Sequence, residues 1–231
     1  MKLPSLTPRL DTIARLIPDC HCFADIGTDH AYLPAFMCMS DISDTAIASD
    51  IKKGPLLRAE KTVTDFKLND RISLRLGAGL DTLKKDEADA VAIAGMGGLI
   101  IAEILREGLN KLTSAKAIIL QPMTAVSELR EFLINNGFTI KEECLAKEDE
   151  KIYNILSVVY TGNNESYSPS ELYLGKYLIE HKPQHFDEYL SKRITKLKNM
   201  IEGLRISTSE DSKKKLIECL TLLKEIERSV L

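Results

Sequence analysis

Short apolar runs alternate with helical patterns through the first half of the chain, and this alternation limits the possible folds more than any other feature. Parallel neighbours in a sheet need a crossover of about a dozen residues or more, so such alternation is typical of parallel strands joined by helices. One helical pattern, residues 54–68, places apolar side chains at spacings of three and four. We therefore predict an α/β fold with helices on both faces of the sheet. The runs that read as strands are Cys22–Asp25, Ala46–Asp50, Ile72–Leu76, Ala90–Ala94 and Ala117–Leu120.

The last part of this pattern is different, because two strand-like runs follow each other without room for a helix. Residues 138–145 and 152–160 are separated only by the polar stretch 146–151, so these two strands should pair antiparallel. A mostly parallel sheet of seven strands that ends in an antiparallel hairpin is the layout of Rossmann-like class I methyltransferases, whereas dehydrogenases usually lack that ending. This part of the prediction rests on fold analogy.

A polar stretch at residues 161–166 indicates a domain boundary, because only helical patterns follow it. We expect a Rossmann-like domain over 1–161 and a helical domain over 162–231, with a first helix near residues 170–180. A turn at residues 207–211 should fold two longer helices back on each other as an antiparallel coiled-coil arm. Their apolar seams are Leu190, Ile194, Leu197, Ile201 and Leu204 in one helix and Leu216, Leu220, Leu223, Ile226 and Val230 in the other.

Composition and charge exclude several classes of protein. No apolar run approaches the roughly 20 residues of a membrane span, and the first residues lack the apolar stretch of a signal peptide. We therefore expect a cytoplasmic protein that does not bind membranes. The five cysteines are scattered without a CxxC pair, which indicates buried reduced thiols and no metal site. Because the formal net charge is −3, any RNA partner would need a local basic patch.

The turn after the first predicted strand, residues 25–30 (Asp-Ile-Gly-Thr-Asp-His), is the first candidate for ligand binding. The ligand site of such a sheet lies at the carboxyl ends of its strands, where the strand order reverses. Only one glycine of the dinucleotide pattern GxGxxG is present, which disfavours a nicotinamide cofactor. Asp25 followed by Gly27 instead resembles the first methyltransferase motif, DxGxGxG. Asp50, at the end of the second strand, could accept both ribose hydroxyls of a nucleoside.

Simpler structural roles remain open for these residues. Asp25 could cap the helix that follows it, Asp50 could cap the helix that starts near Gly54, and His30 could merely begin a helix. The segment Ala94–Gly98, after the fourth strand, could serve the geometry of a turn alone. Its three glycines could also let the backbone approach a flat base very closely, at the place where methyltransferases hold the methyl acceptor.

Two short blocks are far more specific than any single loop: residues 29–34 (Asp-His-Ala-Tyr-Leu-Pro) and residues 94–98 (Ala-Gly-Met-Gly-Gly). Five further blocks accompany them in order: Arg9-Leu10, Asp25-x-Gly27-Thr28, Gly54-Pro55, Gln121-Pro122 and Lys151-x-Tyr153. Together they span about two thirds of the chain and closely resemble the bacterial tRNA (adenine-22-N1)-methyltransferase family, TrmK. The helical C-terminal arm also agrees with that family.

Three positions depart from the pattern of that family. Ala78 stands where an acid or amide usually precedes Gly79 to reach the cofactor adenine, so only backbone is left for this contact. Met123 replaces an asparagine and Asn154 replaces a glutamate. We expect the first departure to reduce cofactor affinity and the other two to affect how the acceptor is positioned.

The resemblance implies that S-adenosylmethionine is the cofactor and that its methyl group goes to N1 of adenine 22 in tRNA. Because N1 lies on the Watson–Crick edge, the target base must leave its stack. The N1 lone pair is already nucleophilic, so alignment should contribute most, with Asp29 the candidate to stabilise the positive ring or accept an N6 proton. The catalytic set is Asp29, Gly95, Met96 and Gly97. The cofactor set is Asp25, Gly27, Thr28, His30, Asp50, Ile51, Gly77, Ala78, Gly79 and Ala94. The tRNA set is Arg9, Tyr32, Gln121, Pro122, Tyr153, Lys192, Arg193 and Lys196.

Two other functions stay open at this point: a small-molecule methyltransferase, and a catalytically silent module that binds a nucleoside or RNA. The projecting arm favours RNA over a small substrate. Acids interleave with its lysines, including residues 213–215, so these charges could equally form a solvated face. We expect a monomer, with any weak self-association made through the arm.

Overall fold

The computed structural model describes residues 3–207 and 209–230, without the side chain of Ser229. The chain divides into two compact units, and the division falls between Glu165 and Ser166, inside the polar stretch that follows the hairpin. The first unit contains the sheet and the second is helical.

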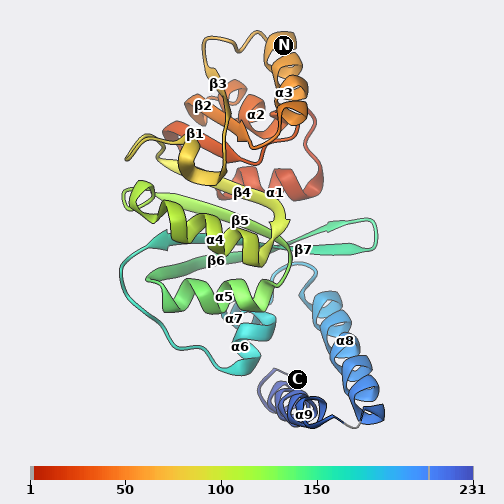
Figure 1. Cartoon of the computed structure of the whole chain (residues 1–231). Helices are drawn as coiled ribbons and strands as arrows, with labels where there is room; N and C mark the ends of the chain where they lie inside the picture. The colour runs from red at the N-terminus through yellow and green to blue at the C-terminus, as the bar shows by residue number, and fades with distance from the viewer. Residues whose placement is uncertain (1–2, 208, 231) are drawn as a thin grey trace. The chain divides into compact units, whose positions relative to one another are not determined.

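The first unit is built on a sheet of seven strands in the order β3-β2-β1-β4-β5-β7-β6 (Figure 1). β1 to β5 pair in parallel, and β7 lies antiparallel between β5 and β6. The predicted mixed sheet with its antiparallel hairpin is thereby confirmed. The strands are β1 (Cys20–Ile26), β2 (Ser43–Asp50), β3 (Ile72–Leu76), β4 (Ala90–Gly97), β5 (Ala117–Thr124), β6 (Phe138–Glu148) and β7 (Lys151–Tyr160).

Several strands run further than the apolar runs that predicted them. β4 continues through Gly97 and β5 through Thr124, with Met96 opposite Pro122. The polar stretch 146–151, expected as a connection, belongs mostly to the outer part of the β6–β7 ladder, and Asp149, at φ 50°, takes part in the tight turn. A ladder is held by backbone hydrogen bonds and needs no apolar side chains, so apolar runs mark only the buried part of a strand.

Helices cover both faces of the sheet. The first three pack on one face, where Ile13, Leu33 and Val63 join the strand residues Phe23 and Ala46 in one buried cluster. The next two lie on the opposite face, in front of the sheet in Figure 1. The first helix begins with the hydroxyl of residue 7 capping it and a proline in its first turn. These helices are α1 (Pro8–Leu16), α2 (Tyr32–Met39), α3 (Lys53–Asp65), α4 (Gly98–Gly108) and α5 (Val126–Asn135).

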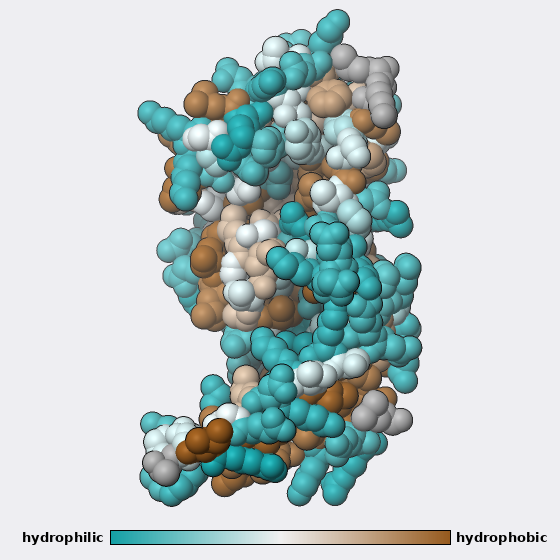
Figure 2. Space-filling model, turned by 90° about the vertical axis from the view of Figure 1, so that its right-hand side faces the viewer, coloured by the Kyte–Doolittle hydropathy of each residue, from teal (hydrophilic) through white to brown (hydrophobic). Residues whose placement is uncertain are grey.

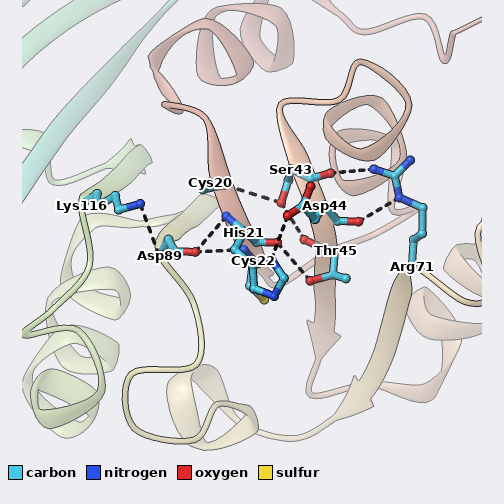
Figure 3. Close-up of polar contacts among 9 residues, drawn as sticks. All are labelled: Cys20, His21, Cys22, Ser43, Asp44, Thr45, Arg71, Asp89 and Lys116. Atoms are coloured by element: carbon cyan, nitrogen blue, oxygen red, sulfur yellow. Dashed lines mark hydrogen bonds and ion pairs between the residues drawn. The ribbon is translucent and has the colours of Figure 1, made fainter.

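A polar network ties together the amino ends of β1, β2 and β4 (Figure 3). Asp89, just before β4, accepts hydrogen bonds from the backbone N–H groups of His21 (2.9 Å) and Cys22 (3.0 Å) and lies 3.5 Å from Lys116. The bond from Cys22 is the main reason that the pKa of Asp89 is lowered. Because the strands are held in register here, their carboxyl ends are aligned at the opposite edge of the sheet.

The second unit contains two short and two long helices: α6 (Pro169–Leu174), α7 (Lys176–His181), α8 (Phe186–Ile206) and α9 (Glu210–Ser229). The expectation of one helix near residues 170–180 is wrong, because Gly175, at φ 103°, separates two short ones. The two long helices, α8 and α9, cover the residues of the two predicted apolar seams except Val230, the C-cap residue of α9. They pack together, with the sulfur atoms of Met200 and Cys219 3.7 Å apart. Their use as a tRNA-binding arm stays a prediction.

Three predictions from composition can be compared with the described part of the chain. No helix in that part is long and apolar enough to cross a membrane. Nor do three His, Cys, Asp or Glu side chains of the described residues gather as a metal site would require. The five cysteines are free thiols, four of them buried, and burial raises the pKa of Cys38 to about 11, which disfavours its reactive thiolate.

Candidate active site

Two cavities open at the carboxyl ends of the parallel strands, and Gly27 borders both of them. They lie where the strand order reverses between β1 and β4, the usual ligand site of such a sheet. The Asp25 cavity, of about 290 Å³, is lined by Arg9, Leu10, Asp25, Gly27, Thr28, Asp29, His30, Ala31, Tyr32, Leu33, Ala94 and Gly95. The Asp50 cavity, of about 220 Å³, is lined by Ile26, Gly27, Ser49, Asp50, Ile51, Gly77, Ala78, Gly79, Met96, Ile100, Ile104 and Glu107.

The two cavities together contain every residue of the predicted cofactor set and three of the four predicted catalytic residues. Two large apolar side chains in the lining of the Asp50 cavity, Ile51 and Ile100, are exposed. Figure 2 looks onto this side of the first unit, where brown and pale residues gather between teal ones. The edge of the sheet that carries the cavities is therefore partly apolar, which suits the flat face of a base.

Gly27 lies where the two cavities meet. Its φ of 83° is a backbone conformation that favours glycine, and a Cβ atom there would overlap the terminal methyl group of Met96. The backbone N–H groups of Gly27 and Thr28 both donate to the carbonyl of Ser49 (2.8 Å each), which ties the loop to β2. The loop is therefore held against β2, with the Met96 side chain packed on Gly27.

Asp25 is the buried carboxyl group of the site. Burial raises its pKa from 3.8 to about 6, and this effect outweighs the hydrogen bond from Thr28 and the positive charge of Arg9, which lower the pKa. Asp25 does not take the helix-capping role left open above: the Thr28 hydroxyl accepts from the N–H of Ala31 (3.1 Å), where α2 begins. A carboxyl group held in this way is suited to bind a positively charged ligand group.

Asp50 faces the second cavity from the end of β2. One of its oxygens accepts the backbone N–H of Lys52 (2.6 Å), so the capping role left open above is partly correct, although Lys52 itself stands at the N-cap of α3. Glu107, from α4, is a further carboxylate in the lining of this cavity. The sequence gives no local signal for it, because it stands in an ordinary helix and reaches the cavity only through the packing of α4 on the loop after β3.

A buried amide connects the remaining blocks of the sequence. Gln121 is fully buried on β5, and its side-chain oxygen accepts from the Arg9 guanidinium (2.7 Å) and from the backbone N–H of Gly95 (3.1 Å). The Arg9 guanidinium also lies over the ring of Tyr153, 5.7 Å from its centre. Gln121 and the neighbouring Pro122 are buried and are therefore placed to hold the end of β4 at Gly95 rather than to touch RNA. Arg9 and Gly95 both line the Asp25 cavity.

Asp29 has two basic neighbours. Arg58 of α3 donates to one of its oxygens, and the other oxygen lies 3.4 Å from Nε2 of His30. The rings of His30 and Tyr32 are stacked, with centres 5.2 Å apart and planes inclined by 3°. Asp29, His30 and Tyr32 thus form an ordered row along the Asp25 cavity. Sequence reasoning missed Arg58, which is 29 residues from its partner.

The remaining predicted residues lie elsewhere. Gly97 stands at the end of β4 beside Thr124, just outside the two linings. In the second unit, Lys192 pairs with Glu188 on the same helix, and Arg193 packs 3.7 Å from the ring centre of Tyr173. Lys196 is exposed on the same helix.

Known proteins resemble the chain over nearly its full length. The family model of the tRNA (adenine(22)-N(1))-methyltransferases, TrmK, matches residues 23–227. The tRNA (adenine(22)-N(1))-methyltransferase of Bacillus subtilis (strain 168) is 36% identical over 229 residues, which cover 96% of each chain. The crystal structure of the B. subtilis M1A22 tRNA methyltransferase TrmK matches with a TM-score of 0.89 and 33% identity, covering 99% of this chain and 100% of that one.

A structure of Streptococcus pneumoniae Sp1610 in complex with S-adenosyl-L-methionine matches with a TM-score of 0.81 and 31% identity, covering 96% of this chain and 99% of that one. The resemblance first suggested by the short sequence blocks is confirmed by all three kinds of comparison. The chain belongs to the tRNA (adenine(22)-N(1))-methyltransferase family, TrmK.

Proposed function

We propose that this protein transfers the methyl group of S-adenosylmethionine to N1 of adenine 22 in tRNA. The observation that carries the proposal is the pair of cavities that both border Gly27, one lined by Asp50 and the other by Asp25 and Asp29. A nucleoside cofactor and a base acceptor need two such adjoining spaces. The bond from the sulfonium sulfur to the methyl group breaks as the N1–carbon bond forms, so positive charge passes from sulfur to the adenine ring.

The Asp50 cavity fits the nucleoside part of the cofactor. Asp50 can accept hydrogen bonds from the ribose hydroxyls, and the backbone of Gly77 to Gly79 can contact the adenine. Ala78 has no side-chain group that could bind the adenine. Besides Asp50, Glu107 is the carboxylate in the lining of this cavity that could accept a hydrogen bond from the cofactor. Asp25, on the other side of Gly27, can bind the ammonium group of the cofactor's amino-acid end.

The Asp25 cavity fits the acceptor base. Gly95 presents backbone to the cavity, and the His30–Tyr32 stack provides an aromatic surface along it. Asp29 can stabilise the charge that develops on the ring or accept an N6 proton. The protein therefore acts mainly by holding the target adenine outside its stack in the tRNA and by aligning its N1 with the methyl group.

The direct test uses unmodified bacterial tRNAs and labelled S-adenosylmethionine, followed by digestion and identification of the methylated nucleoside. We expect 1-methyladenosine at position 22, and loss of the label when position 22 is changed to guanosine. Label on a small molecule alone would favour a small-molecule methyltransferase. Cofactor binding by calorimetry with no label on any substrate would favour a silent binding module.

Asp25 should make cofactor binding depend on pH. The cofactor is a cation and binds the ionised carboxylate, so with a pKa of about 6 in the free protein the dissociation constant should rise about tenfold between pH 7 and pH 5. Calorimetry over this range measures the effect, and Asp25→Asn should abolish the pH dependence while weakening binding at pH 7. A profile that stays flat in the unmodified protein would contradict this assignment.

The same shift has a consequence for stability. Because the folded pKa lies above the unfolded value, Asp25 contributes stability below about pH 4 that is lost as the pH rises through about 6. The rise in the pKa of Asp25 corresponds to a loss on the order of 3 kcal/mol in the free energy of unfolding at neutral pH, in the protein without cofactor. Asp25→Asn should therefore raise the melting temperature at pH 7.5, and this gain should fade at pH 4.

We also propose that the second unit binds tRNA phosphates and that the protein acts as a monomer in the cytoplasm, where its substrate is found. Lys196 and the run 213–215 supply exposed positive charge on α8 and α9. Changing Lys213 to Lys215 to glutamine should raise the KM for tRNA and reduce its dependence on salt, with the cofactor constant unchanged. If the variant and the unmodified protein have the same KM for tRNA and the same dependence of KM on salt, these lysines do not contact tRNA and only face solvent.

A further inference from the structure

Arg58 reaches from helix α3 to the loop that carries Asp29. Its Nε donates to Oδ1 of Asp29 over 3.0 Å, and a second guanidinium nitrogen donates to the same oxygen. Oδ2 of Asp29 is left on the other side, 3.4 Å from Nε2 of His30. The two carboxylate oxygens of Asp29 therefore have different neighbours, and one of them is held by a planar, two-pronged donor.

We propose that Arg58 is a positioning residue, which fixes the Asp29 carboxylate so that Oδ2 faces the acceptor base. The proposal rests on the function proposed above, because it concerns the same methyl acceptor. The Asp29 side chain is 61% exposed, so without a partner it would rotate freely in solvent. Two donors on one oxygen restrict that rotation, and reaction rates depend steeply on such orientation.

The backbone of Arg58 is itself well placed for this task. The next residue, Ala59, is fully buried, and Val63 of the same helix packs into the same core cluster. The Arg58 side chain therefore starts from a fixed point on the helix and reaches the loop that carries Asp29. Isolated ion pairs that are half exposed contribute little to stability, so orientation of the loop carboxylate is the more substantial effect of this contact.

Removing Arg58 should lower turnover without weakening binding. We expect Arg58→Ala to reduce kcat roughly 10- to 50-fold, with the KM for tRNA and the cofactor dissociation constant within about threefold. Arg58→Lys keeps the positive charge but loses the two-pronged guanidinium, so its kcat should lie between that of Arg58→Ala and that of the unmodified protein. Lys61→Ala, on the same helix and also exposed, is the matched control and should leave all constants unchanged.

A double-mutant cycle shows whether Arg58 acts through Asp29. In the Asp29→Ala background, where no carboxylate remains to be positioned, adding Arg58→Ala should change kcat less than twofold. If Arg58 instead contacts a tRNA phosphate, its loss would raise the KM for tRNA, reduce the salt slope and add fully to Asp29→Ala. That result, or a kcat of Arg58→Ala equal to that of the unmodified protein, would overturn the proposal.

A spectroscopic measurement keeps the test independent of activity. In a protein labelled with ¹⁵N-arginine, the Nε–H signal of Arg58, assigned from its loss in Arg58→Ala, should be sharp and slow to exchange with water. It should broaden or shift in Asp29→Ala and stay unchanged in Lys61→Ala. If no tRNA is methylated, the proposed function fails, yet this signal still shows whether Arg58 holds Asp29. A signal that Asp29→Ala leaves unchanged would rule out the pairing.

Discussion

Replacing Asp29 with alanine is expected to lower kcat by about 10²- to 10³-fold, while the dissociation constant of S-adenosylmethionine changes less than about tenfold. Asp29 lines the Asp25 cavity, which we assign to the acceptor, and the nucleoside is assigned to the other cavity. A carboxylate that meets positive charge only as the methyl group arrives stabilises the transition state more than the bound ground state. The loss should therefore appear in turnover.

The measurement combines single-turnover kinetics at saturating cofactor with calorimetry of cofactor binding. Asp44→Ala is the matched control, because Asp44 is also an exposed carboxylate paired with a histidine, His21 at 2.8 Å, but lies at the opposite edge of the sheet (Figure 3). It should leave both constants unchanged. Equal losses of turnover and cofactor affinity in Asp29→Ala would reassign Asp29 to cofactor binding, and an unchanged kcat would remove it from the mechanism.

The fold could be predicted from the sequence because its signals are local. Apolar periodicity separates strands from helices, and a gap too short for a crossover identifies the antiparallel hairpin. The errors have local causes as well. Residues 146–151 are polar yet mostly paired, since a hairpin that extends beyond the core needs only backbone hydrogen bonds. Gly175 divides a helical pattern because its φ of 103° lies outside the helical range, which periodicity alone does not reveal.

The candidate site was predictable only where its residues follow strand ends. Asp25, Asp50 and Gly95 lie at or near the carboxyl ends of three neighbouring parallel strands, and the topology of such sheets brings strand ends together. Arg58 and Glu107 stand on the surface patterns of ordinary helices. Their presence beside the cavities depends on how those helices pack, and one sequence carries no local record of that packing.

Gln121 shows that a sequence motif does not by itself reveal the role of a residue. Its sequence block resembles the TrmK pattern, which led to a prediction that it contacts tRNA. The structure places it in the core of β5, where its amide oxygen joins Arg9 to Gly95. A motif therefore identified a residue of the site, but burial decides whether such a residue touches the ligand or holds another residue in place.

A buried ion pair in the first unit gives the largest expected effect on stability. Arg130 of α5 and Glu143 of β6 are both fully buried. Nε of Arg130 lies 3.1 and 3.2 Å from the two carboxylate oxygens, and a second nitrogen donates to one of them over 2.7 Å. Removing one partner would leave a buried charge without its counterion, which costs about 3–5 kcal/mol in comparable cases.

We therefore expect Arg130→Met to lower the free energy of unfolding of the first unit by about 3–5 kcal/mol, or its melting temperature by roughly 10 °C. Urea unfolding followed by circular dichroism measures the change. Arg15→Met is the matched control, because Arg15 forms an ion pair with Asp11 on the exposed side of α1, and it should have no measurable effect.

The double variant Arg130→Met/Glu143→Leu separates the energy of the pair from the cost of breaking it. Desolvation of two charges offsets much of their attraction, so replacing both with apolar groups of similar size should restore stability to within about 2 kcal/mol of the unmodified protein. If the double variant instead stays about 3–5 kcal/mol less stable than the unmodified protein, as each single variant does, the pair contributes attraction well beyond its desolvation cost. In that case α5 depends on Arg130 and Glu143 for its attachment to β6, and not only on the apolar side chains around them.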